Sequence, residues 1–139
     1  MRPPDPLREL ALDFLAKAQG DVEFALAGVD RARAPGWGIA FHCQQAVEKA
    51  IKGALSLNDV TPPKTHDLER LGDLASSAGL AVPLNHAELR ALTQFAVDDR
   101  YPRLTLSDVS RETAIAFLPS ATGAVEWLAG LVRVDGDAG

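Results

Sequence analysis

The sequence has very little cysteine and no excess of positive charge. Cys43 is the only cysteine, which excludes an internal disulfide and a CxxC metal site. The histidines, His42, His66 and His86, have no metal-ligand spacing, so we expect no metal and no cofactor. The formal net charge of −5 gives no general attraction for nucleic acid or an anionic membrane, and we expect no DNA partner.

Long apolar runs are also absent. No segment reaches the roughly 18 consecutive apolar residues that suggest a bilayer-spanning helix. The residues that follow Met1 lack the apolar centre of a signal peptide. We therefore expect no membrane partner and a cytoplasmic location. The 139 residues match one domain, with an expected ordered core at residues 6–133 and a disordered tail at 134–139.

Helical periodicity, by contrast, runs through most of the chain. Apolar residues recur at spacings of three and four, and no stretch shows the sustained alternation of a strand. We predict the longest helices near residues 6–33, 38–57 and 108–132, and shorter helices at about 65–79 and 84–98. Short connections between long amphipathic helices favour an all-α, up-and-down antiparallel bundle of five helices.

Capping residues and prolines refine these helices. Asp5 before Pro6 is a good start for the first helix, and Thr65 is the expected N-cap of the third. Gly79 should end the third helix. Ser107 or Asp108 should cap the last helix, in which Pro119 predicts a kink about one turn earlier.

A polar set occupies the second predicted helix. Gln45, Glu48, Lys49 and Lys52 lie at i, i+3, i+4 and i+7, and therefore share one face of that helix. Glu48 and Lys52 have the favourable i, i+4 order. Two interpretations remain open: a solvated face with one salt bridge, or a binding surface. Gln44 flanks the apolar stripe, so its amide needs hydrogen-bond partners if it is buried.

A second polar set lies near residue 100. Asp98 and Asp99 fall in the last turn of a predicted helix, where the helix dipole disfavours carboxylates. Arg100 and Arg103 can offset that charge, which is the structural interpretation. The functional interpretation is a clustered site that includes Tyr101, since guanidinium groups suit phosphate or carboxylate recognition. Local rules alone do not separate these two interpretations.

Three segments together resemble the HEPN domain family, named for nucleotide-binding domains of higher eukaryotes and prokaryotes. Residues 41–52 (FHCQQAVEKAIK) resemble its QQAxEKxxK signature, residues 62–68 (PPKTHDL) a following THDL element, and residues 100–102 (RYP) an element of one branch. They occur in the expected order, so that the resemblance covers about residues 6–133. The resemblance implies a bundle of long up-and-down helices.

The resemblance implies two kinds of activity. Many members pair with a small nucleotidyltransferase in toxin–antitoxin-like modules, whereas others are RNases with an Arg, four to six residues, and then a His. The nearest spacing here, Arg33 to His42, has eight residues between, and no histidine follows Arg100. Because histidine is the usual acid or base for RNA cleavage, the sequence favours a member that is not itself catalytic.

Our leading hypothesis is therefore a non-catalytic HEPN protein that binds a nucleotide or a nucleotidyltransferase partner, as a homodimer. One wall of its site would hold Gln45, Glu48, Lys49 and Lys52, and the other Thr65, His66, Asp98, Asp99, Arg100 and Tyr101. Two alternatives stay open: a metal-independent RNase toxin with a diverged site around His66 and Arg100, and a pure interaction scaffold.

Overall fold

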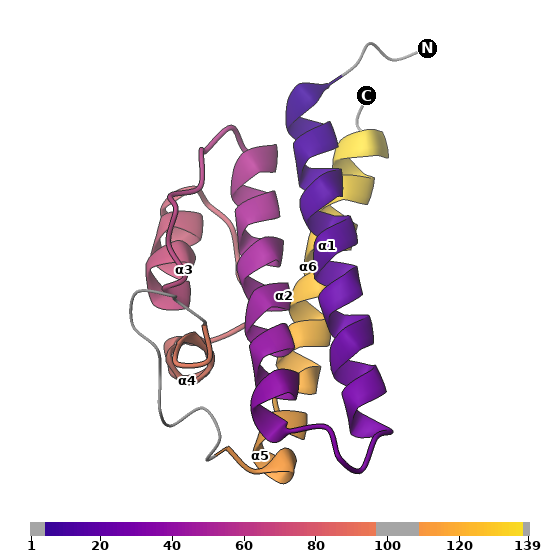
Figure 1. The fold of residues 1–139 in the computed structure, drawn as a ribbon. Helices are drawn as coiled ribbons and strands as arrows, with labels where there is room; N and C mark the ends of the chain where they lie inside the picture. The colour runs from indigo at the N-terminus through magenta and orange to yellow at the C-terminus, as the bar shows by residue number, and fades with distance from the viewer. Residues whose placement is uncertain (1–4, 97–108, 138–139) are drawn as a thin grey trace.

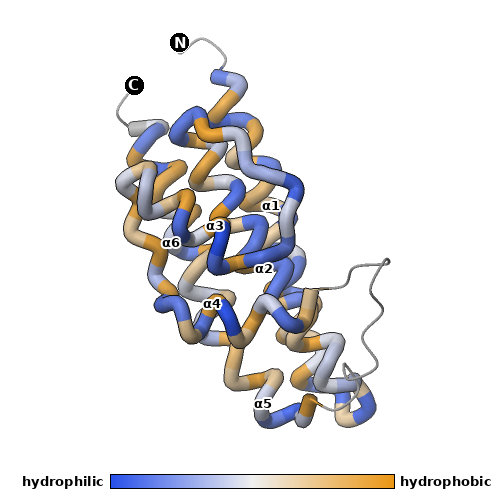
Figure 2. The backbone as a smooth tube through the Cα atoms, turned by 90° about the vertical axis from the view of Figure 1, so that its left-hand side faces the viewer, coloured by the Kyte–Doolittle hydropathy of each residue, from blue (hydrophilic) through white to orange (hydrophobic). Residues whose placement is uncertain are grey.

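The computed structural model describes residues 5–96 and 109–137, and every regular element in these two ranges is an α-helix (Figure 1). The helices are α1 (Pro6–Val29), α2 (Gly36–Leu57), α3 (Leu68–Ser77), α4 (His86–Thr93), α5 (Arg111–Ile115) and α6 (Leu118–Asp137). Hydrophilic and hydrophobic residues alternate along them, as amphipathic helices require (Figure 2). The predicted all-α bundle is confirmed.

Helix α2 occupies the centre of the bundle. It runs antiparallel to α1, while α6 lies beside both and runs opposite to α1, so that α1 begins at the end where α6 finishes (Figure 1). Helices α3 and α4 pack together on the side of α2 away from α1. Because α2 contacts every other described helix, its polar residues Gln44, Glu48 and Ser56 are buried between elements.

Small residues allow the three long helices to approach closely. Ala11, Ala18 and Ala25 recur every seven residues on α1 and are completely buried. On α2, a Cβ added to Gly53 would lie 2.7 Å from Leu128 Cδ2 of α6 and 3.0 Å from Phe14 Cβ of α1. A larger residue at this three-helix contact would therefore force Leu128 or Phe14 to shift.

The start of the chain follows its predicted caps, and one later cap does not. The Asp5 carboxylate accepts from the amides of Leu7 and Arg8, with Pro6 in the first turn as predicted. Gly79, at φ +83°, follows α3 as predicted. The N-cap of α3 is Asp67, not Thr65, because the Thr65 hydroxyl instead accepts from the Asp67 amide at 3.1 Å.

In the C-terminal half, the observed helix boundaries differ from the predicted ones. Helix α4 ends at Thr93, earlier than predicted, and Phe95 turns inward to pack on Phe117 at 5.5 Å between ring centroids. The predicted final helix is divided into α5 and α6 just before Pro119, where a kink was expected. The N-cap of α5 is Ser110; Ser107 and Asp108 lie outside the described residues.

Helix α6 extends further than expected. It continues to Asp137, through residues that we predicted as part of a disordered tail. By length and composition alone, Arg111–Gly136 is apolar enough to cross a membrane. A single such segment is weak evidence, because core helices pass the same test. Ala121, Ala124 and Leu128 of this segment are buried in the bundle core.

Candidate functional site

Two carboxylates are almost completely buried beside α2: Asp21 of α1 and Glu48 of α2 itself. A buried charge is costly unless it is paired and hydrogen-bonded. Each of these two carboxylates is contacted by one lysine and one histidine. The polar set of α2 is therefore not a solvated face with one salt bridge.

The Asp21 carboxylate joins α1 to α2. Its Oδ1 lies 2.9 Å from His42 Nδ1, and its Oδ2 accepts from the Lys49 ammonium. Because an ionised carboxylate only accepts, the proton of this contact is on His42 Nδ1. The Nε2 of His42 then remains available, since no residue in the described part of the chain bonds to it.

The Glu48 carboxylate joins α2 to the loop before α3. It accepts from Gln44 Nε2 at 3.1 Å, from Lys52 Nζ at 3.1 Å and from His66 Nδ1 at 2.8 Å. Gln44 is fully buried; its Nε2 also donates to the His66 carbonyl, and its Oε1 accepts from Gln45 Nε2 at 2.6 Å. These contacts hold the His66 backbone and ring against α2.

Four partly exposed side chains form a line on α2, which we call the α2 polar row: His42, Gln45, Lys49 and Lys52. Their spacings of three and four place them on one face of the helix. Asp21 and Glu48 lie beneath the row and fix both lysines. With neutral histidines, the two lysines balance the two carboxylates, so that the charges of the site cancel without a ligand.

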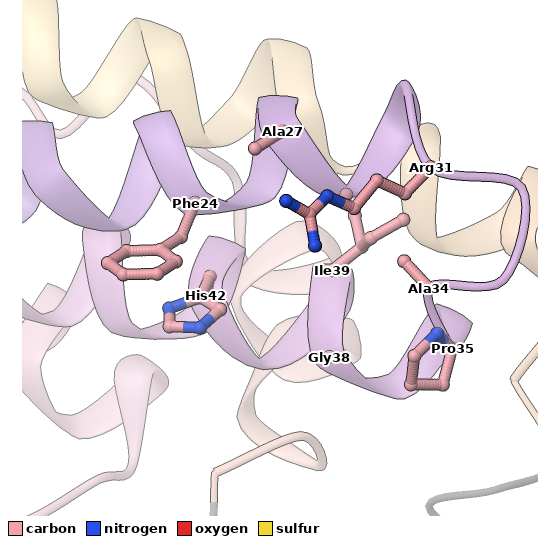
Figure 3. A pocket seen from close by; sticks show the side chains of 9 residues that line it. Phe24, Ala27, Arg31, Ala34, Pro35, Gly38, Ile39 and His42 are labelled. Atoms are coloured by element: carbon pink, nitrogen blue, oxygen red, sulfur yellow. The ribbon is translucent and has the colours of Figure 1, made fainter.

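A cavity of about 290 Å³ continues this face between the end of α1 and the start of α2 (Figure 3). His42 lines it and stacks on Phe24, with 5.0 Å between ring centroids and 12° between ring planes. Arg31 also lines it, whereas the rest of its wall is apolar or glycine: Ala27, Gly28, Ala34, Pro35, Gly38 and Ile39. The cavity therefore combines an apolar floor with two nitrogen-bearing side chains.

The structure brings together only some of the predicted site residues. Gln45, Glu48, Lys52 and His66 form one hydrogen-bonded cluster. Lys49 points instead to Asp21, and the Thr65 hydroxyl accepts from the Asp67 amide. Asp98, Asp99, Arg100 and Tyr101 lie outside the described residues, so that the second predicted wall stays a prediction.

Sequence reasoning missed Asp21 and the role of His42. Asp21 lies three residues after Ala18 and four before Ala25, on the stripe of α1 that packs into the core. A carboxylate on an apolar stripe signals a buried polar contact. Gln44 was noted for its position, and its buried amide does have the partners that this position requires.

The potential metal ligands of the described residues are dispersed, and Cys43 is buried. Among residues 5–96 and 109–137, no group of three or more His, Cys, Asp or Glu side chains could hold a metal ion. Burial raises the pKa of the Cys43 thiol to about 12, which keeps it protonated at neutral pH.

Comparison with known sequences relates this chain to a protein family. The sequence model of the HEPN domain matches residues 36–131, from the first residue of α2 to well inside α6. Searches of curated proteins and of solved structures found no match. The matched region holds most of the α2 polar row's surroundings, although Asp21 precedes it. A match over more than half of the sequence shows that this chain belongs to the HEPN domain family.

Proposed function

We propose that this HEPN domain binds the phosphates of a nucleotide along the α2 polar row and does not cleave RNA. The observation that carries the proposal is the pair of buried carboxylates, each of which fixes a partly exposed lysine. A lysine that is already ordered loses little further side-chain entropy when it binds an anion. Two such lysines one turn apart can contact one polyphosphate together.

The histidines strengthen this site. His42 and His66 each present Nδ1 to a carboxylate, which leaves their second ring nitrogen for another partner. An imidazole N–H can donate a hydrogen bond to a phosphate oxygen, so that the two rings would add donors beside the two lysines.

Partnership belongs to the same proposal. The resemblance to HEPN proteins that pair with nucleotidyltransferases makes such an enzyme the proposed partner, in a toxin–antitoxin-like module, with the phosphate site at or near their contact. We also propose a homodimer, supported by large apolar side chains that remain exposed: Leu10, Leu12, Leu26, Trp37 and Val134. Sedimentation of the purified chain would test it, and a monomer would contradict it.

Calorimetric titration with tripolyphosphate tests the phosphate site itself. Asp21→Asn/Lys49→Gln and Glu48→Gln/Lys52→Gln each remove a cation together with its carboxylate, so that neither variant leaves a buried charge unpaired. We expect each to weaken binding at least tenfold. Arg133→Ala, an exposed cation on α6, is the control and should bind as wild type. Unchanged binding in both paired variants, with intact circular dichroism, would refute the proposal.

One observation favours the metal-independent RNase as the second candidate. Two histidines oriented by carboxylates resemble the positioned acid and base that such a reaction needs. The proposal of a binding protein predicts no cleavage of RNA by the purified chain and no growth arrest on expression. Cleavage that His66→Ala or His42→Ala abolishes would make the RNase the better account.

A further inference from the structure

The proposed phosphate site leaves most of the residues that line the cavity between α1 and α2 without a role. Most of its wall is apolar, and its two polar members, Arg31 and His42, come from different helices or their ends (Figure 3). Its volume of about 290 Å³ is close to the lower limit of small-ligand sites, roughly 300 Å³. A site of this size suits one ring system with its substituents, not a long chain.

The cavity is continuous with the α2 polar row through His42. The ring of His42 lines the cavity, and its Nδ1 contacts the same carboxylate as Lys49. The ammonium group of Lys49 therefore lies one carboxylate away from the cavity wall. A ligand that enters the cavity can extend directly onto the row.

We infer that this cavity holds the base of the nucleotide whose phosphates lie on the α2 polar row, an inference that rests on the proposed function. Phe24 is 68% exposed although it is a large aromatic residue, and one face of its ring is ordered by stacking on His42. Aromatic rings and guanidinium groups are the side chains on which nucleic-acid bases stack.

Arg31 completes the recognition. Its guanidinium extends across the cavity toward Phe24 and His42 (Figure 3). No carboxylate in the described ranges pairs with it, which leaves its donors for a ligand. Phe24 and Arg31 both precede residue 36, where the match to the HEPN family begins. The base site is thus built partly from residues that the family match does not include.

Two probes separate the base site from the phosphate site. ATP carries a base and a triphosphate, whereas tripolyphosphate carries only the phosphates. We expect Phe24→Ala and Arg31→Ala to weaken ATP binding by about tenfold, from lost stacking, and to leave tripolyphosphate binding unchanged. Arg33→Ala is the matched control, because this exposed arginine is two residues away and does not line the cavity. It should bind both probes as wild type.

Filling the cavity gives a second test that does not truncate any side chain. A Cβ at Gly38 would meet only Pro35 Cγ, at 3.8 Å, so that a larger residue fits the backbone there. Gly38→Leu should abolish the preference for ATP over tripolyphosphate without lowering the melting temperature. In wild type, ATP should shift the backbone amide resonances of Gly28 and Gly38, which line the cavity, and tripolyphosphate should shift them less.

The outcomes distinguish the two proposals. If the paired neutral variants of the row lose tripolyphosphate binding while Phe24→Ala, Arg31→Ala and Gly38→Leu bind ATP as wild type, the phosphate site stands and the base site is refuted. If Arg31→Ala and Arg33→Ala weaken ATP binding equally, the effect comes from the loss of positive charge in general, and the base site is also refuted. If Phe24→Ala changes the sedimentation of the protein but not ATP binding, Phe24 belongs to a protein interface and the inference is overturned.

Discussion

Glu48 and Glu69 have nearly the same partners in two very different surroundings. Glu48 contacts Lys52 and His66, and its side chain is 6% exposed between α2 and the following loop. Glu69 of α3 contacts Arg90 and His86 of α4, and its side chain is 30% exposed. The first set is enclosed and the second is open to water. Removing a partner of Glu48 should therefore cost more stability than removing a partner of Glu69.

The degree of burial decides how much each set of interactions contributes to stability. Arg90 binds Glu69 through two parallel hydrogen bonds of 3.0 and 3.2 Å, which is the better-shaped pair. Water can replace both partners there, so that the net contribution is small. Glu48 is 6% exposed, so that the loss of a partner would leave its charge poorly solvated. The burial of an ion pair is thus a better guide to its contribution to stability than its hydrogen-bond geometry.

The largest expected effect breaks the enclosed set. Lys52→Ala removes the cation nearest to Glu48 and leaves a buried carboxylate with only Gln44 and His66. We expect it to lower the free energy of unfolding by about 3 kcal/mol, measured by urea denaturation. Glu48→Gln/Lys52→Gln removes both charges and should cost clearly less. Equal losses in the two variants would show that the charge of Glu48 is not what makes the site sensitive.

An intermediate effect applies the same contrast to two glycines. Gly53→Ala forces a methyl group against Leu128 and Phe14, and should cost about 1–3 kcal/mol by overpacking. Gly20→Ala on α1 has no atom within 4 Å of the new Cβ. It should stabilise α1 by about 0.5–1 kcal/mol because alanine loses less entropy in a helix. Thermal melts of both variants give the comparison, which fails if the signs agree.

The smallest effect concerns the exposed set. The hydrogen bond from Arg90 lowers the pKa of Glu69, with smaller contributions from the charges of Arg90 and His86. A lowered carboxylate pKa stabilises the fold above the unfolded pKa, and that contribution is lost as pH falls through the folded pKa. Arg90→Ala should therefore cause a slight loss of stability at pH 7 and none at pH 2. A loss as large as that of Lys52→Ala would overturn the contrast.

Short-range features of this chain were predictable from residue order. Asp5 with Pro6, the end of the second helix at Leu57 and Gly79 each depend on a few neighbouring residues, and the structure has them as predicted. The placement of Gln45, Lys49 and Lys52 on one face follows from helical spacing alone. The three motifs at residues 41–52, 62–68 and 100–102 together indicated the family that the match later showed.

Contacts between elements were not predictable in this way. Nothing in the spacing of α2 selects a partner for Lys49, but it reaches Asp21, 28 residues away on α1. His66 reaches Glu48 across 18 residues, which depends on how the loop folds back over α2. Phe24 and His42, which line the cavity, likewise meet because α1 and α2 pack side by side. Helical spacing specifies neighbours within three or four residues, whereas partners on separate helices are selected by how those helices pack.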